Sequence, residues 1–396
     1  MHDIYLLISE NSYFFNYAIA LLAVIFAYNG FSIYSWIVLG FVFILQFDPQ
    51  LTFWLWYAIV PIVIGFRSVR RHLITRYIVK LIKRLKLLPK ISDTERTALR
   101  SGNVWVDGQL FSGKPDFKWI FKQKYPKLTK EEQKFLDNET EQLCAMCDDA
   151  QVSQNKDLPK EIWKFIADKK FFGMIISKKY GGLGFSAYAH SAIIQKLSSR
   201  SVPLAITVMV PNSLGPAELL LHYGTKKQQD YYLPRLASGK EIPCFGLTEP
   251  KAGSDANSIE SNGVVFKDKG KIKIKLNWKK RYITLGAVST VIGLAFKLRD
   301  PDNLLQKGED LGITCALIKS NSKGVILGRR HDPLSTHFIN SPINGEDVII
   351  NIDDVIGGEQ GVGKGWKMLM ECLAAGRGIS LPSTSAGGSK MVARYI

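Results

Sequence analysis

Apolar residues dominate the first 66 positions of the chain, and short polar breaks divide them into three runs. The runs are Tyr13–Tyr28, Phe31–Phe47 and Leu51–Phe66, and the breaks are Asn29-Gly30 and Asp48-Pro49-Gln50. A helix that spans a bilayer needs about 20 mostly apolar residues. Each run is at or just below the lower edge of the usual range of about 17–25 residues, so the pattern predicts two or three membrane helices over residues 1–66.

Two further features favour a membrane over a protein interior for this segment. Trp36, Trp54 and Trp56 lie near ends of the runs, where interfacial aromatic residues are expected. The alternative is a buried apolar helical subdomain of a soluble protein, but such a core would rarely lack Lys and Arg over 66 residues. A cleaved signal peptide is disfavoured because the segment has no basic region at its start.

Basic residues concentrate directly after the apolar segment. Residues 67–90 hold nine Lys and Arg and no acidic residue, which is about half of the net charge of +17. This pattern predicts a basic juxtamembrane helix over residues 67–90 that anchors at a membrane surface, with the rest of the chain on the cytoplasmic side. A solvated basic helix is the alternative. We expect no nucleic-acid partner, because no nucleic-acid-binding motif accompanies the charge.

Helical periodicity marks most of the next part of the chain, and we assign residues 91–240 to a helical domain. Capping-box patterns begin at Ser92 and Thr129, each with a glutamate three residues later. The expected helices are 129–152, 159–167, 187–199, 213–223 and 226–237.

The pattern changes to a period of two at about residue 241. Expected strands are 242–247, 263–267, 271–276, 281–284, 290–296, 313–318, 325–328 and 347–352. They define a β-barrel-like domain over residues 241–358. A helical pattern resumes after Gly365, and we assign residues 359–396 to the first helix of a C-terminal bundle. The chain is thus predicted to be a multi-domain α+β protein.

Composition excludes several classes of protein. With 46% apolar residues among 396, the chain is not globally disordered, and 5 Cys are too few for a disulfide scaffold. Cys144 and Cys147 form a lone CxxC without further ligands, and the six histidines form no metal or triad pattern, so we expect no metal. The glycine-rich turns near Gly182 and Gly363 lack the context of a dinucleotide-binding unit.

Two polar segments of the β domain are candidates for chemistry. Cys244–Asp255 ends a strand and enters a turn of Thr, Pro, Gly and Ser, while Lys280–Gly286 follows about 30 residues later. Such a turn exposes backbone N–H groups and hydroxyls, which suit a polar ring system or a phosphate. These residues alone predict a β domain with one polar binding edge, and an ordinary surface loop stays open.

The same segments carry a family resemblance. Leu247-Thr-Glu-Pro-x-Ala-Gly-Ser-Asp255 resembles the signature of the acyl-CoA dehydrogenase flavoproteins. Further similar stretches follow the family order over roughly residues 130–396: Lys179–Gly184, Asn212–Gly215, Tyr223–Thr225 with Gln228, Asn277–Thr284, and Gly365-Trp366 to Gly376-Arg377. The apolar and basic start resembles the long FadE-type bacterial enzymes, which would place the chain at the bacterial inner membrane with its catalytic domains in the cytoplasm.

The resemblance implies an enzyme. FAD would lie between the β domain and a C-terminal four-helix bundle, and acyl-CoA thioesters would be converted to trans-2-enoyl-CoA in fatty-acid β-oxidation. A carboxylate base would remove the α-proton, and the β-hydrogen would leave as hydride to the flavin. Electron-transferring flavoprotein would accept the electrons, and the full-length enzyme would form a homo-oligomer.

The resemblance also implies roles for single residues. It assigns seven residues to the cofactor: Phe245, Leu247, Thr248, Ser254, Tyr282, Ile283 and Thr284. Tyr282 stands where the family usually has Trp beside the isoalloxazine, and Thr284 matches the threonine near flavin N5. Ser254 and Arg377 are implied to contact the acyl-CoA substrate.

One departure from the family concerns the catalytic base. The base lies either late in the bundle, which would be beyond Ile396, or just before the arginine matched by Arg377, where this chain has Gly376. We therefore expect an N-terminal part of a longer enzyme, without a base and with weak FAD binding by itself. The alternative is a non-catalytic, membrane-anchored remnant that binds acyl-CoA or lipid.

Overall fold

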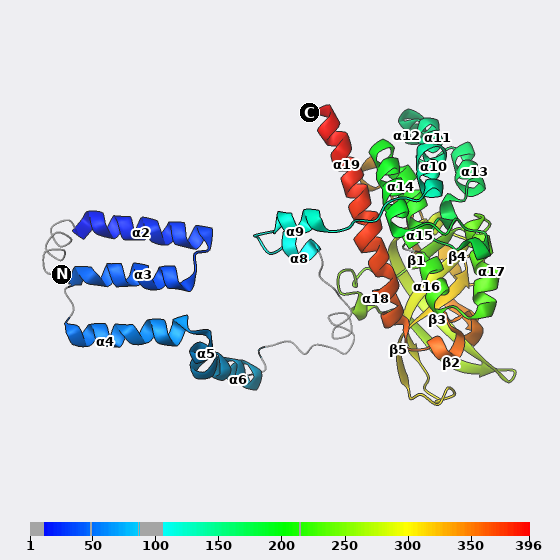
Figure 1. Ribbon diagram of the computed structural model, residues 1–396. Coiled ribbons are helices and arrows are strands. Elements are labelled where there is room, and N and C mark those ends of the chain that lie inside the picture. Colours follow the sequence, from blue (N-terminus) through cyan, green and yellow to red (C-terminus); the bar gives the residue numbers. More distant parts are fainter. Residues whose placement is uncertain (1–11, 48–49, 86, 88–105, 214) are drawn as a thin grey trace. The chain divides into compact units, whose positions relative to one another are not determined.

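The computed structural model describes residues 12–47, 50–85, 87, 106–213 and 215–396. The chain divides into two compact units, Met1–Arg96 and Thr97–Ile396, which are described separately (Figure 1). The capping-box prediction at Ser92 and Glu95 lies outside the described residues.

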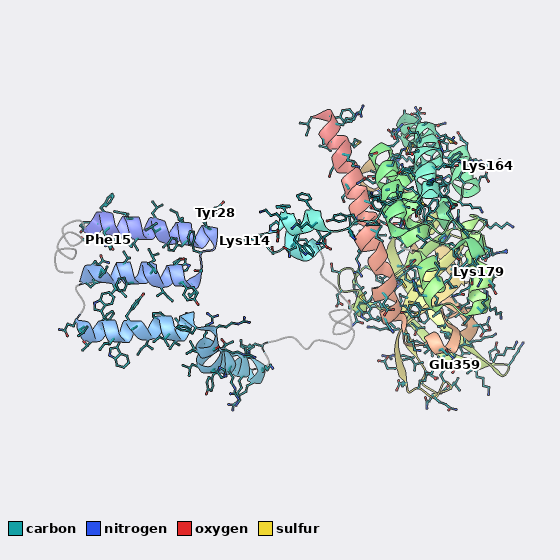
Figure 2. All side chains as sticks on the ribbon, in the orientation of Figure 1. Phe15, Tyr28, Lys114, Lys164, Lys179 and Glu359 are labelled. Carbon is teal, nitrogen blue, oxygen red and sulfur yellow. The ribbon has the colours of Figure 1, made fainter. Side chains whose placement is uncertain are left out.

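Each apolar run of the first unit folds as a helix. The segments are α2 (Ser12–Asn29), α3 (Ile33–Ile44) continuing into η1 (Leu45–Phe47), and α4 (Leu51–Val60) continuing into η2 (Pro61–Gly65). Two tyrosine hydroxyls join these helices: Tyr57 donates to the carbonyl of Ile37 at 2.6 Å, and Tyr34 donates to that of Gly65 at 3.0 Å. Leu39 is buried and Phe41 contacts Trp54, but many other large side chains are exposed, as for Tyr28 at 90% (Figure 2).

The basic segment turns away from the preceding helix. It comprises α5 (Arg67–Arg70), η3 (Arg71–Thr75) and α6 (Arg76–Arg84), and Arg67–Arg84 is bent by 81° from Leu51–Gly65. Among the described residues, two helices are long and apolar enough to cross a bilayer, and the bent pair would add a third. One is Ser12–Asn29, with no buried part, and the other is Val202–Tyr223, which is 82% buried in protein. Membrane insertion of the first unit stays a prediction.

The second unit begins with helices. They are α8 (Val106–Leu110), α9 (Phe117–Lys122), α10 (Lys130–Asp137), α11 (Glu139–Met146), α12 (Asp149–Asn155), α13 (Lys160–Asp168), α14 (Ala187–Arg200), α15 (Val202–Ser213), α16 (Pro216–Tyr223) and α17 (Lys226–Ala237). The capping box of Thr129 and Glu132 is confirmed at the start of α10. The single helix expected over 129–152 was wrong: the chain breaks at Asn138, and the Asp148 side chain caps a new helix, α12.

Seven strands in the described part of the chain form one curled sheet. They are β1 (Pro243–Gly246), β2 (Asn262–Asp268), β3 (Lys271–Thr284), β4 (Val291–Arg299), β5 (Asp310–Lys319), β6 (Val325–Leu327) and β7 (Asn340–Asn351). Their order is β1-β4-β2-β3-β7-β6, with β5 also on β4. Because β1 and β2 pair with successive parts of β4, they occupy the same edge of that strand.

Two strand predictions need correction. The expected strands 271–276 and 281–284 are one strand, β3. Its register with β7 shifts at two bulges: the one between Leu276 and Trp278 has its extra residue in β7, and the one between Lys280 and Ile283 has it in β3. Strand β7 begins at Asn340 rather than at 347, since polar residues and Pro342 hide the alternation in its first half. Despite these irregularities, one continuous apolar core joins the sheet to helices α10–α15.

The C-terminal helical run consists of α18 (Gly365–Ala375), the π-helix η11 (Gly376–Ser380) and α19 (Leu381–Tyr395), which packs on α14 (Figure 1). The helices approach closely at Gly387, where a Cβ would lie 2.0 Å from the Ser198 hydroxyl and 2.4 Å from the Gln195 carbonyl. Four residues earlier, the hydroxyls of Ser383 and Ser191 lie 2.7 Å apart. Small residues therefore set the contact between α14 and α19.

Replacing Gly387 tests this contact. We expect Gly387→Ala to weaken the docking of α19 by about 1–3 kcal/mol, because the new methyl group meets backbone atoms that cannot yield. Hydrogen–deuterium exchange of α19 amides should then become faster. Gly388→Ala is the matched control, since no atom lies within 4 Å of its Cβ position. It should slow exchange or leave it unchanged, and equal effects of both variants would contradict the close contact.

Candidate functional site

Strand β1 presents Phe245 at its partly buried end. It pairs in parallel with β4, and Phe245 lies opposite Gly293. A Cβ on Gly293 would lie 2.5 Å from the Phe245 ring, so only glycine leaves room for this aromatic side chain. The pair of residues thus sets the position of Phe245 relative to the sheet.

Backbone groups fasten the chain after β1 to strand β3. The carbonyl of Thr248 accepts the Arg281 N–H at 2.9 Å, and the carbonyl of Leu247 accepts the Lys280 ammonium at 3.1 Å. Leu247 and Thr248 are both half-buried. The two polar segments found in the sequence are therefore neighbours in space.

A buried ion pair lies beneath this junction. The Lys280 Nζ atom is 2.7 Å from Glu249 Oε1, and the two side chains are 0% and 3% exposed. Glu249 also accepts the hydroxyl and N–H of Ser261 and the N–H of Glu260. Because all of these donors converge on one carboxylate, the turn after β1, strand β3 and the start of β2 are tied together.

Burial and charge act oppositely on the two groups. Burial lowers the pKa of Lys280 to about 8, against the opposing effect of the Glu249 carboxylate. Burial alone would raise the pKa of Glu249, but the ammonium of Lys280 and the hydrogen bonds from Ser261 and Glu260 hold that pKa below its usual value. The ionised pair is therefore the form that the fold accommodates at neutral pH.

Tyr282 projects from the bulge in β3 toward solvent. It has a positive φ of 59°, and its side chain is 53% exposed. The Arg281 guanidinium carbon lies 4.4 Å from its ring centroid, and the His331 ring centroid lies at 5.3 Å. Arg281 and His331 thus flank a partly exposed aromatic ring at the edge of the sheet.

Thr284 lies at the end of β3, beside a short polar chain. The Asn340 amide donates to its hydroxyl oxygen at 3.5 Å, and the Asn340 side-chain oxygen lies 2.8 Å from His331 Nδ1. The Thr284 hydroxyl can thus direct its own hydrogen elsewhere. Ile283 differs, because its side chain is buried in the core and only its backbone is available to a ligand.

Ser254 and Arg377 come from two other segments of the chain. Ser254 is exposed beyond the turn closed by the backbone bonds between Glu249 and Ala252. Arg377 is exposed on η11. Among the described residues, no hydrogen bond or ion pair joins either side chain to Thr248, Tyr282 or Thr284.

A buried histidine anchors η11. His190 on α14 lies 3.4 Å from the Ser380 hydroxyl, which donates to the Ser213 hydroxyl of α15 at 2.7 Å. Burial lowers the pKa of His190 to about 4, so the imidazole is neutral at pH 7. This neutral contact fixes the turn that carries Arg377.

The sequence reasoning missed the Lys280–Glu249 pair, although a signal was present. Alternation along β3 places Ile274, Leu276 and Trp278 inward, and Lys280 is the next inward position. A lysine on the buried face of a strand requires an acidic partner. The inward position of Lys280 would therefore have predicted a buried carboxylate nearby. In contrast, no sequence pattern predicted that Asn340 and His331 lie beside Thr284.

Comparison with known proteins identifies the family. Residues 126–240 match the acyl-CoA dehydrogenase N-terminal domain, and residues 244–348 match the acyl-CoA dehydrogenase middle domain. The chain belongs to the acyl-CoA dehydrogenase family. Members of this family are oxidoreductases that act on CH–CH donors, and their cofactor is FAD.

Curated relatives match parts of the chain. It is 57% identical to protein HemX of Proteus mirabilis over 99 residues, which are 25% of this chain and 58% of HemX. It is 33% identical to the 3-(aryl)acrylate reductase of Clostridium sporogenes over 230 residues, 57% of each protein. The chain thus spans somewhat under three fifths of the length of these two relatives.

Solved structures share the acyl-CoA dehydrogenase fold. Butyryl-CoA dehydrogenase from Megasphaera elsdenii superposes with a TM-score of 0.59 at 23% identity, covering 68% of both chains. Other solved relatives hold FAD. The edge of this chain fits that group, since it combines the open ring of Tyr282 with the hydroxyl of Thr284 and the bulge backbone.

Other chemistry finds less support in the described part of the chain. No group of three or more His, Cys, Asp and Glu side chains there could hold a metal ion. Cys144 and Cys147 are both buried, and burial raises the pKa of each thiol. Both thiols are therefore protonated and packed in the core at neutral pH.

Breaking the buried pair tests its role. Glu249→Gln or Lys280→Met should each lower the free energy of unfolding by about 3–5 kcal/mol, because each leaves one buried charge without its partner. The double variant should lose less stability than the two single variants added together, because it leaves no unpaired charge. Urea-unfolding curves measure all three.

An exposed pair on the same turn provides the control. Lys251 and Glu260 lie 3.3 Å apart with side chains 77% and 65% exposed. Lys251→Met should change stability by less than about 1 kcal/mol. Strict additivity of the two buried substitutions would contradict the coupling.

The lowered pKa of His190 predicts that the free energy of unfolding depends on pH. The unfolded imidazole titrates near pH 6.5 and the folded one near 4, so between these values only the unfolded chain gains a proton. Stability should therefore fall by about 3 kcal/mol as the pH drops through this window. Urea midpoints at several pH values measure the loss, and His190→Gln should remove this component. An unchanged slope in that variant would show that other groups cause it.

Proposed function

We propose that the chain carries the flavin-binding part of an enzyme that dehydrogenates acyl-CoA thioesters to trans-2-enoyl-CoA, as in fatty-acid β-oxidation. The observation that carries this proposal is the hydrogen bond between Thr248 and Arg281. It brings the turn with the family signature beside the Tyr282–Thr284 edge, which supports a single site built from both motifs.

The chain's own residues would hold FAD, which would accept two electrons from the substrate. Phe245, Leu247 and Thr248 offer partly buried side chains and backbone groups along one side of the edge. Tyr282, the backbone of Ile283 and the Thr284 hydroxyl offer the other. The Lys280–Glu249 pair would hold both sides in place before the cofactor arrives, so that little ordering is needed on binding.

Substrate and partners are proposed from the family resemblance. Ser254 and Arg377 are both exposed, as residues that reach a CoA thioester must be. Gly376, beside Arg377, carries no carboxylate and so cannot be the proton acceptor. Electron-transferring flavoprotein is the proposed electron acceptor, and a homo-oligomer is the proposed assembly.

The first unit would attach the enzyme to a membrane. Its apolar helices expose most of their large side chains, in contrast to Val202–Tyr223, which protein covers. The basic residues that follow favour the cytoplasmic side of a bacterial inner membrane for the second unit. This location would place the dehydrogenase beside a lipid surface.

A non-catalytic protein that binds acyl-CoA or lipid is the competing function. The glycine at position 376 favours it, because that position carries no carboxylate. The two functions differ in what acyl-CoA does to bound flavin. An enzyme with its base transfers two electrons and bleaches the flavin absorbance, whereas a binding protein perturbs the spectrum without bleaching.

FAD titration followed by flavin fluorescence tests the proposed site. Thr284→Val and Tyr282→Leu should each weaken FAD binding roughly tenfold, through loss of one hydrogen bond and of one aromatic face respectively. Tyr188→Leu is the control, because Tyr188 is an exposed tyrosine of α14. Unchanged affinity in both site variants would refute the assignment of this edge to FAD.

Anaerobic addition of long-chain acyl-CoA then separates the functions. Bleaching of bound flavin in the full-length gene product would support dehydrogenation. Retained flavin absorbance with saturable acyl-CoA binding in that product would instead support the non-catalytic alternative.

A further inference from the structure

Helix α6 separates basic and apolar side chains onto opposite faces. Arg76, Lys80, Lys83 and Arg84 follow the spacing i, i+4, i+7 and i+8, which places them on one side of an α-helix. Ile78, Leu81, Ile82 and Leu85 follow i, i+3, i+4 and i+7 on the other side. A helix divided in this way is typical of a surface between water and an apolar phase.

Within the first unit, the described residues leave most of the apolar face of α6 uncovered. Ile78 is 51% exposed, Leu81 55% and Leu85 56%. The basic side chains are exposed as well. Water would thus contact three large aliphatic side chains, an arrangement that marks a binding surface.

The bend before α6 determines how its apolar face would be oriented relative to a membrane. The axis of Arg67–Arg84 makes an angle of 81° with that of Leu51–Gly65, and the Arg70 guanidinium braces the bend by donating to the Ile64 carbonyl at 2.8 Å. If the apolar helix crosses a bilayer near its normal, the basic helix lies close to the membrane plane. Its apolar side can then face lipid along its whole length.

Charge indicates which lipid surface fits. Residues 67–85 contain seven Lys and Arg and no Asp or Glu. Anionic headgroups attract such a segment, and each basic side chain near the surface strengthens binding roughly fivefold. The phosphate groups and the apolar layer beneath them match both faces of α6 at once.

We propose that α6 lies flat in the interface of an anionic phospholipid bilayer, with Ile78, Leu81 and Leu85 in the acyl region and Lys80 and Lys83 at the headgroups. This inference rests on the proposed membrane location of the first unit and adds the lipid class and the orientation. A nucleic acid would use the basic face and leave the apolar one in water. A second copy of α6 would bring like charges together.

Site-directed spin labelling of the full chain in lipid nanodiscs tests the orientation. The five native cysteines are buried, and burial raises the pKa of Cys244, Cys315 and Cys372 to about 12, so an added exposed cysteine reacts first. Labels at Ile78→Cys and Leu81→Cys probe the apolar face, while Lys80→Cys probes the basic face. Nanodiscs contain phosphatidylcholine alone or mixed with phosphatidylglycerol.

In discs with phosphatidylglycerol, we expect the labels at 78 and 81 to collide with oxygen and to avoid a water-soluble nickel reagent. The label at 80 should show the reverse. Lys83→Gln with Arg84→Gln should reduce the lipid-bound population roughly 25-fold at limiting anionic lipid, at about fivefold per charge. The matched control, Lys83→Arg with Arg84→Lys, keeps the charge and should retain the contact.

Three results would overturn the proposal, and each has a distinct signature. Equal water access of all three labels, in a chain that remains in the discs, would show a solvated helix. Dipolar broadening between labels would show self-association of α6. A chain that does not enter the discs would refute the membrane location itself, while the FAD titration of the second unit would be unaffected.

Discussion

The buried pair of Lys280 and Glu249 is the interaction on which the candidate site depends. A lysine and a glutamate removed from water lose hydration that only close pairing and further hydrogen bonds can replace. Here the replacement comes from the turn after β1, from β3 and from the residues before β2. Loss of the turn or of β3 would leave a charge unpaired, and loss of the residues before β2 would remove hydrogen bonds from the Glu249 carboxylate, so the three segments are held in one arrangement.

This arrangement explains how strand β3, despite its bulges, can hold Tyr282 and Thr284 in fixed positions. The bulge between Lys280 and Ile283 directs Tyr282 to solvent, while Lys280 and Ile283 themselves remain buried. A bulge in an otherwise weakly held strand could shift along the chain. The ion pair fixes Lys280 at the inward position, and Asn340 pairs with Thr284 at the other end, so the bulge has only one register.

The sequence predicted elements better than it predicted connections between them. Apolar runs bounded by Asn29-Gly30 and Asp48-Pro49 mark helices α2, α3 and α4, because length and periodicity suffice for that. The family resemblance pointed to Thr248 and Tyr282 together, but only the fold shows the backbone bond that joins their segments. Long-range pairs such as His331 with Asn340, or His190 with Ser380, depend on which elements meet, and local pattern does not record this.

The π-helix between α18 and α19 lets one helical run contact two different partners, strand β5 through α18 and helix α14 through α19. Each inserted residue rotates all later side chains by about 100° around the axis. The face of α18 that rests on β5 is therefore not continuous with the face of α19 that contacts α14. Excision of a single residue from Gly376–Ser380 would restore regular winding and turn Ser383 and Gly387 by about 100° around the helix axis, away from α14.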